Sequence, residues 1–162
     1  MLLVLYKQVL NQTKNSKNKI YSLDESDVYC IAKGKAGVPY EFGFKVGIAI
    51  GVENTVILGN HCCKKNIHDS KVAPEVLDHV ESITGRRPKN SFQDRGFKGA
   101  KDDKGTEMIC PDIPSKEVFS SIKEEKKYFF RRISKVEGII SHLKLYHRLG
   151  MDFLKGFDSA DK

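Results

Sequence analysis

The amino-acid sequence predicts a mixed α/β fold from two hydrophobic patterns and the length of the chain. In residues 131–144, apolar side chains recur at three-and-four spacing, which is typical of a helix that buries one face: Ile133, Val136, Ile140 and Leu143. In residues 42–52, β-branched residues recur at alternate positions, as in a strand. The 162 residues, 40% of them hydrophobic, suit one domain with its own core. These patterns alone indicate no more than this class.

The N-terminal part is predicted to supply one helix and two strands. Residues 1–18 begin apolar and become polar, so a short helix followed by a linker is expected. Residues 19–23 and 28–32 are each predicted to form a short strand, and an acidic cluster separates them.

A turn and a hairpin are predicted next. Residues 33–39 are rich in glycine and lysine and indicate a basic turn. Residues 42–52 and 55–58 are predicted to pair as a hairpin, with Glu53 and Asn54 at its turn. A loop is expected to follow this hairpin.

The loop is predicted to cover residues 59–68 and to lead into an amphipathic helix. This helix is expected to begin with Asp69 or Ser70 as its N-cap and to end at Gly85. Asp69 is also a candidate acid, although capping is the better explanation of its position. The buried face is predicted to contain Val72, Val76, Leu77, Val80 and Ile83.

Two short strands and a long helix complete the predicted elements. Residues 89–94 predict a strand that enters a turn at residues 95–97 and exposes Asp94 at its end, and residues 107–110 predict another strand. Residues 115–149 are predicted to be helical, with Gly150 as the stop.

The charge balance favours a polyanionic partner. The formal net charge is +7 at neutral pH, and residues 115–148 hold nine basic residues against four acidic ones. A solvated helix face with ordinary ion pairs is the alternative explanation for that excess. No membrane-spanning stretch and no secretory signal is recognised, so no membrane partner is expected.

The cysteines indicate a reducing compartment. Four are present, and none forms a Cys-x-x-Cys pair, so a disulfide framework is not expected and a reducing cytoplasm suits the chain. His61, Cys62, Cys63 and His68 lie close together in sequence, but their spacing matches no standard zinc site.

Several short motifs follow one another in an order that matches a known family. In the final motif six residues separate Glu137 from Lys144, and the motif lies after Arg131-Arg132 and before the run Tyr-His-Arg-Leu-Gly at residues 146–150. The motifs before it are Lys19-Ile-Tyr-Ser-Leu, Ile31-Ala-Lys-Gly-Lys, Tyr40-Glu-Phe-Gly-Phe-Lys-Val and Asp94-Arg-Gly-Phe-Lys-Gly. Together they resemble bacterial insertion-sequence transposases of the DDE class, over about residues 19–156.

The resemblance implies an α/β fold of the ribonuclease-H-like kind, in which a mixed sheet is flanked by helices. The catalytic domain would then occupy residues 19–150. Residues 1–18 would be an N-terminal helix and linker remnant, and residues 151–162 a truncated tail. On this view the chain is a catalytic domain truncated at both ends.

The resemblance also implies a chemistry, which is metal-dependent cleavage of DNA phosphodiesters and strand transfer at the ends of an insertion sequence. Two Mg²⁺ or Mn²⁺ ions held by three carboxylates suffice for it. The motifs match Asp94 as the second acid and Glu137 as the third, and Asp24 is the expected first acid. Glu25 is the alternative first acid and Asp27 the next, while a solvated acidic turn would explain the same cluster.

Glu137 has a second explanation. It lies beside the apolar stripe of its helix, where a carboxylate needs a nearby cation if it is buried. A metal ion would meet that need, and so would an ion pair with Lys144 or Arg148.

DNA is the expected partner, bound by a homodimer in the bacterial cytoplasm at the nucleoid. The basic residues expected to contact DNA are Lys144, Arg131, Arg132, Lys135, Arg95, Lys33 and Lys35. The sequence departs from the family at Phe130 and Ile133, where many relatives have Tyr and Arg. Two alternatives stay open: an inactive remnant that binds DNA without catalysis, and a host nuclease of the same fold.

Overall fold

A computed structural model describes residues 2–33, 37–110 and 124–151. Within these residues the protein is mixed α/β, as predicted, with α-helices and three two-stranded sheets, one of them parallel. The chain divides into two compact units. Among the described residues, unit 1 contains 2–33, 37–45 and 62–66, and unit 2 contains 46–61, 67–110 and 124–151.

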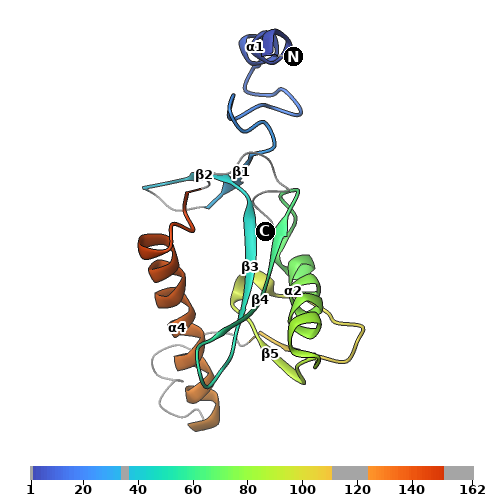
Figure 1. The fold of residues 1–162 in the computed structure, drawn as a ribbon, viewed down its shortest axis with the longest axis vertical. Helices are drawn as coiled ribbons and strands as arrows, with labels where there is room; N and C mark the ends of the chain where they lie inside the picture. The colour runs from blue at the N-terminus through green and yellow to red at the C-terminus, as the bar shows by residue number, and fades with distance from the viewer. Residues whose placement is uncertain (1, 34–36, 111–123, 152–162) are drawn as a thin grey trace. The chain divides into compact units, whose positions relative to one another are not determined.

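Unit 1 contains a helix and an antiparallel strand pair (Figure 1). Helix α1, Leu2–Leu10, confirms the predicted N-terminal helix. Strand β1, Tyr29–Ala32, confirms the predicted second strand and pairs with β2, Tyr40–Gly43, so that Tyr29 lies opposite Gly43. Helix α1 exposes several apolar side chains, Leu3, Val4 and Leu10 among them.

The strand predicted at residues 19–23 is wrong, because this segment has no strand conformation. The side chain of Gln12 instead hydrogen-bonds to both backbone groups of Ile20. Its amide nitrogen donates to the Ile20 carbonyl at 3.1 Å, and its amide oxygen accepts from the Ile20 N–H. A side chain that satisfies both backbone groups replaces the ladder that a neighbouring strand would have provided.

The predicted strand at residues 42–52 is divided in two. Strand β3, Lys45–Ile50, begins after Phe44 and pairs with β4, Ile57–Cys63, whereas β2 pairs with β1. Gly43 has a φ of 151°, which favours glycine, and the Lys45 amide donates to the Tyr29 hydroxyl at 2.6 Å. The turn after β3 lies where predicted, but the predicted loop at 59–68 begins too early, because β4 continues to Cys63.

Helix α2, Asp69–Thr84, packs closely on the β3–β4 hairpin (Figure 1). A Cβ atom on Gly59 would lie 2.9 Å from the backbone nitrogen of Val80, and one on Gly47 would lie 2.6 Å from a Val76 methyl group. The helix backbone therefore approaches β4 at a distance that only glycine permits.

The buried face of α2 is largely as predicted. Val72, Val76, Leu77 and Val80 are buried, but Ile83 is 61% exposed, so its predicted burial is wrong. Gly85 ends the helix in the left-handed conformation, with φ 69°, as predicted. The predicted N-cap is wrong, because His68 caps the helix and accepts from the Ser70 amide at 3.3 Å. Its ring nitrogen reaches the amide that an Asp or Ser cap would otherwise satisfy.

Two short strands of unit 2 pair in parallel. Strand β5, Asn90–Phe92, and strand β6, Glu107–Ile109, confirm the two predicted strands, and Ser91 lies opposite Met108. The 3₁₀ helix η1, Arg95–Phe97, follows β5 at the predicted turn and packs against α2.

The last described element is helix α4, Glu124–Tyr146. Its predicted start, from residue 115, lies outside the described residues. The helix was predicted to continue to residue 149, before Gly150, but it ends at Tyr146. Arg148 takes the left-handed conformation with φ 57°. No helix in the described part of the chain is long and apolar enough to cross a membrane.

Candidate functional site

Asp94 lies just beyond the carboxyl end of parallel strand β5, where its side chain caps η1. Its Oδ1 accepts a hydrogen bond from the Gly96 amide, and the Cys110 thiol lies 3.2 Å from its main-chain carbonyl. The residue is exposed, as predicted from its position before a glycine turn. A capping hydrogen bond fixes the orientation of the carboxylate while the side chain remains accessible.

A second carboxylate, that of Asp69, lies beside Asp94. A Cβ atom on Gly96 would lie 2.8 Å from Asp69 Oδ2 and 3.3 Å from Asp94 Oδ1, so both oxygens border the same small space. Asp69 is in the first turn of α2, where the helix dipole favours a negative charge. Two carboxylates at one place supply the oxygen ligands that Mg²⁺ prefers.

Glu137 lies on α4 and is exposed. The apolar stripe beside it is half-buried, in agreement with the predicted helical face. Within the described residues the Glu137 side chain forms no hydrogen bond or ion pair, so the predicted pairing with Lys144 or Arg148 is not found. Water satisfies an exposed carboxylate, and burial therefore imposes no need for a cation here.

The candidate first acids belong to unit 1, whereas Asp94 and Glu137 belong to unit 2. Asp24 lies in an exposed bend and not at a strand end, because residues 19–23 are not a strand. Glu25 is half-buried, and its amide donates to the Ser22 hydroxyl at 3.0 Å, while Asp27 is exposed.

The expectation that Asp24, Asp94 and Glu137 together bind metal ions stays a prediction. No three His, Cys, Asp or Glu side chains among the described residues form a group that could hold a metal ion. Among the described glycines, Gly96 is the one whose surroundings bring two carboxylates together, those of Asp69 and Asp94.

The basic residues predicted to contact DNA differ in their surroundings. On α4, the side chains of Arg131, Lys135 and Lys144 are exposed, and Arg95 is exposed on η1. Lys33 forms an ion pair of 3.0 Å with Glu41, which reduces its availability for a phosphate.

Two of the predicted DNA-binding side chains fall outside the described part of the chain. Lys35 lies outside the described residues, and so does the side chain of Arg132. Most of the predicted DNA-binding side chains that the structure describes thus lie on α4.

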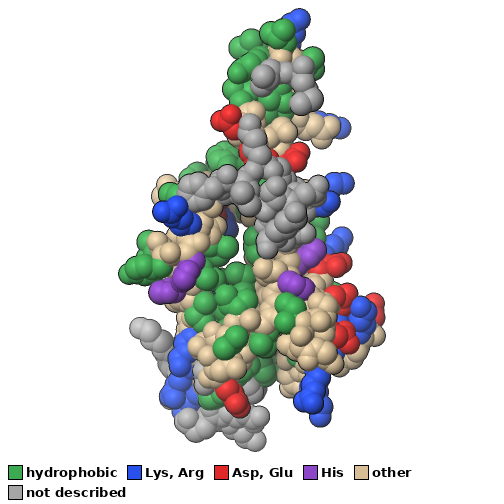
Figure 2. All heavy atoms as spheres, viewed as in Figure 1, with side chains coloured by type: hydrophobic (Ala, Val, Ile, Leu, Met, Phe, Trp, Pro, Cys, Tyr) green, Lys and Arg blue, Asp and Glu red, His purple; other side chains and the backbone are tan. Residues whose placement is uncertain are grey.

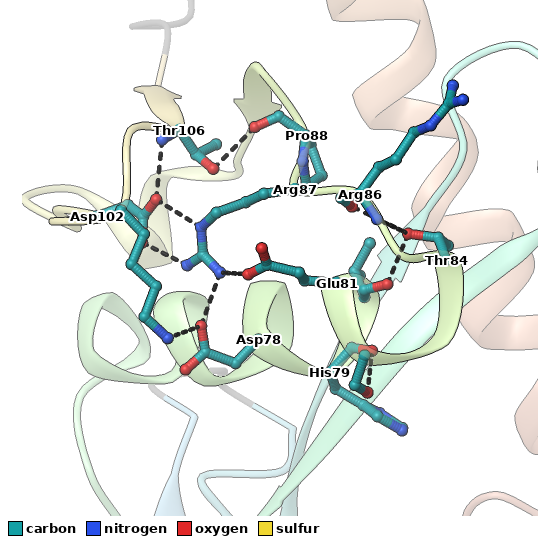
Figure 3. A network of polar contacts seen from close by, with 12 residues as sticks. Asp78, His79, Glu81, Thr84, Arg86, Arg87, Pro88, Asp102 and Thr106 are labelled. Carbon is teal, nitrogen blue, oxygen red and sulfur yellow. Dashed lines mark hydrogen bonds and ion pairs between the residues drawn. The ribbon is translucent and has the colours of Figure 1, made fainter.

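A charged network that the sequence analysis missed joins α2 to the loop between β5 and β6 (Figure 3). Arg87 binds Asp102 through two hydrogen bonds, from Nε at 2.9 Å and from Nη2 at 2.5 Å. Its Nη1 binds Asp78 at 2.7 Å and Glu81 at 2.8 Å, and Lys104 also binds Asp78 at 2.8 Å. Acidic and basic side chains accordingly intermingle on the side of the molecule that carries α2 (Figure 2).

The centre of this network is buried. The Arg87 and Asp102 side chains are 9% and 2% exposed, and the Thr106 amide donates to Asp102 at 2.8 Å. Hydrogen bonding to Arg87 holds the pKa of the Asp102 carboxyl well below its usual range, and Asp102 in turn raises the pKa of Arg87. Lys104, followed by Arg87, lowers the pKa of Asp78.

The sequence holds little signal for this network. Asp78 and Glu81 have the spacing of neighbours on one helix face, but Asp102 lies 15 residues after Arg87. The Arg-Arg-Pro run at residues 86–88 looks like a simple connection between a helix and a strand. An arginine three residues after a helix whose last two turns contain acidic residues is the local clue that could have suggested a partner.

A scan against protein-family models finds no match for this chain. Searches of curated proteins and of solved structures find none either. Any functional assignment therefore depends on the sequence motifs and on the geometry around Asp94.

Proposed function

We propose that the chain is a catalytic domain of a DDE-class transposase, with a ribonuclease-H-like fold, that cleaves and joins DNA phosphodiesters with the help of Mg²⁺ or Mn²⁺. The ordered motifs over residues 19–156 support the assignment. The observation that carries it is the exposed Asp94 carboxylate beyond the end of a parallel strand, with the Asp69 carboxylate beside it at Gly96.

The described residues suit a cation at this place. Asp94 Oδ1 is held by the Gly96 amide, which orients the carboxylate and leaves its second oxygen for a metal ion. Bound divalent ions would activate a water or 3′-hydroxyl for attack and stabilise the leaving oxygen. In the proposal Glu137 supplies another ligand from α4, and Asp24, or alternatively Glu25, supplies the first acid.

DNA binding is proposed for the exposed basic residues of α4, which are Arg131, Lys135 and Lys144. Basic side chains that neutralise phosphates release counterions, and this release drives binding of any sequence. A homodimer on DNA, in the bacterial cytoplasm, completes the proposal.

A second candidate function is DNA binding without catalysis. The observation that favours it is that no three-carboxylate group occurs among the described residues, although exposed basic residues do occur on α4. The two candidates differ in whether a divalent metal ion leads to strand breaks.

The deciding experiment incubates the purified chain with supercoiled plasmid DNA and Mg²⁺ or Mn²⁺, and measures nicked product. Asp94→Asn and Glu137→Gln should each reduce the nicking rate by at least about 100-fold, because outer-sphere changes at metal sites already cost about 10- to 100-fold. The matched controls are Asp103→Asn, in an exposed loop, and Glu75→Gln, exposed on α2. Both controls should nick at the wild-type rate.

Each outcome decides between the candidates. DNA binding with no metal-dependent nicking by the wild type would favour the non-catalytic function. Nicking that survives both Asp94→Asn and Glu137→Gln would show that these carboxylates are not the catalytic group.

A further inference from the structure

Unit 1 contains a hollow of about 420 Å³, and Asp27 is the one residue among the candidate acids that lines it. Its wall includes Lys19, Lys64, Lys65, Tyr21 and Tyr29. The remaining lining combines two asparagine amides, a serine hydroxyl and the Asp27 carboxylate with Ile20, Val28 and Cys30. The composition suits an anionic ligand that also has a flat apolar part.

One wall of the hollow is fixed by hydrogen bonds to β1. The Tyr29 hydroxyl donates to the Cys63 carbonyl at 2.9 Å, and the Asn66 side-chain amide donates to the Cys30 carbonyl at 3.1 Å. These two bonds attach both ends of the segment 63–66 to β1 and thereby bring Lys64 and Lys65 to the hollow. Burial raises the pKa of Tyr29, so its hydroxyl remains a donor.

Another part of the lining is residues 19–21, from the segment that was predicted to be a strand. Gln12 holds it at Ile20, and the next residue, Tyr21, also lines the hollow. This ring lies against Phe42 of β2, with ring centroids 5.3 Å apart. Tyr21 is 43% exposed and Phe42 is 60% exposed, so the pair offers aromatic surface to a ligand.

Charge and aromatic surface together define the ligand. The described residues of unit 1 include eight lysines against four acidic residues. Lysine ammonium groups bind phosphates as point charges, and exposed rings stack on bases of any sequence. In a duplex the bases are paired and stacked, so a ring at the wall of a hollow reaches an unpaired base far more readily.

We propose that this hollow is a binding site for single-stranded DNA, in which Lys64 and Lys65 contact phosphates and Tyr21, backed by Phe42, stacks on an unpaired base. None of the residues that line the hollow belongs to α4 or to the carboxylates near Gly96. It goes beyond the proposed function, because binding here requires neither a metal ion nor strand cleavage.

The test measures fluorescence anisotropy of a short labelled oligothymidylate and of a duplex of equal length, with the full chain in EDTA. Tyr21→Ala should raise the Kd for the single strand about tenfold, as expected for the loss of one stacked base, and leave the duplex Kd unchanged. Lys64→Ala and Lys65→Ala should each reduce the slope of log Kd against log salt by about 0.7. The controls are Tyr6→Ala on α1 and Lys71→Ala on α2, which lie outside the hollow and should have no effect.

Two further measurements keep the proposal falsifiable if Tyr21→Ala unfolds. Tyr21→Phe retains the ring and should bind the single strand as the wild type does. An oligonucleotide with 5-iodouracil should photo-crosslink to the wild-type chain within residues 20–33, the tryptic peptide that contains Tyr21.

The opposite results overturn the proposal. Equal losses of single-strand and duplex affinity in Tyr21→Ala would show a general electrostatic surface, and so would lysine variants that weaken binding while Tyr21→Ala does not. Crosslinks confined to α4 would place the strand elsewhere. Because the assay contains EDTA, its result is independent of the nicking assay, and either can fail alone.

Discussion

The Arg87 network allows a sharp prediction about stability. The perturbation is Asp102→Asn, which keeps the shape of the side chain but removes its charge. Asp102 is 2% exposed and accepts from Arg87 and from the Thr106 amide, so the substitution leaves part of a buried guanidinium charge without its partner. The matched control is Asp103→Asn, at the exposed neighbouring position.

The magnitude follows from what remains around Arg87. Breaking a buried ion pair by removing one partner costs about 3–5 kcal/mol. Asp78 and Glu81 still bind the guanidinium, but they are 41% and 45% exposed and compensate only in part. We therefore expect a loss of about 2–3 kcal/mol in the free energy of unfolding, at or just below the lower end of that range. For a chain of this size the loss lowers the Tm by about 4–12 °C.

The assay is thermal and urea unfolding followed by circular dichroism, at several pH values. The folded-state pKa of Asp102 is lowered, so its contribution to the free energy of unfolding is fully present above about pH 4, the unfolded-state pKa. This contribution is lost as the pH falls from there towards the lower folded-state pKa. The difference between wild type and Asp102→Asn should therefore shrink below about pH 4. A difference under about 0.5 kcal/mol at neutral pH, no larger than that of Asp103→Asn, would refute the reasoning.

Two other predictions concern close packing and DNA affinity. Gly59→Ala should destabilise the protein by about 2–3 kcal/mol, because its methyl group meets the backbone of α2 and no rotamer relieves the clash. Gly138→Ala on α4, which meets nothing within 4 Å, should instead stabilise it by about 0.5–1 kcal/mol, and urea unfolding of both variants tests the contrast. Arg131→Ala with Lys135→Ala should flatten the salt dependence of duplex binding by about 0.9 for each phosphate that the variant no longer neutralises; an unchanged slope would show that this face of α4 is merely solvated.

The elements that sequence patterns predicted well are those with a local cause. Helix α2 follows from the spacing of Val72, Val76 and Val80, and its end follows from Gly85, which has the predicted left-handed conformation. Each of these features depends on residues within a few turns of one another. The mixed α/β class was predictable for the same reason.

The elements that were missed depend on distant partners. The segment at residues 19–23 has a composition that suits a strand, but Gln12 takes both hydrogen-bonding groups of Ile20. Likewise, the alternating pattern at residues 42–52 continues across a point where the Tyr29 hydroxyl binds the Lys45 amide and the ladder changes partner. Periodicity reports which side chains face one way, and it contains no information on which strand or side chain lies next to them.

The candidate site shows the same limit in a form that matters for function. The sequence marks Asp69 and Asp94 as separate candidate acids, but their approach to one space arises only because η1 packs on the start of α2. Nothing in the 24 residues that separate them in the sequence reports this approach.

The Arg87 network bears on how the Asp69 and Asp94 carboxylates come to lie near each other. The connection between β5 and β6 is attached to α2 at three places: η1 contacts the helix near Asp69, Lys104 binds Asp78, and Asp102 binds Arg87 close to the C-terminal end of the helix. β5 begins three residues after Arg87, so the guanidinium anchors the strand that leads to Asp94 as well as the loop that returns from it. If Asp102 released Arg87, η1 and the exposed ion pair of Lys104 with Asp78 would still attach the loop to α2, but the buried attachment would be lost and the distance between the two carboxylates would be less restrained. We therefore expect the buried ion pair to restrain the geometry of the candidate site as well as to stabilise the fold.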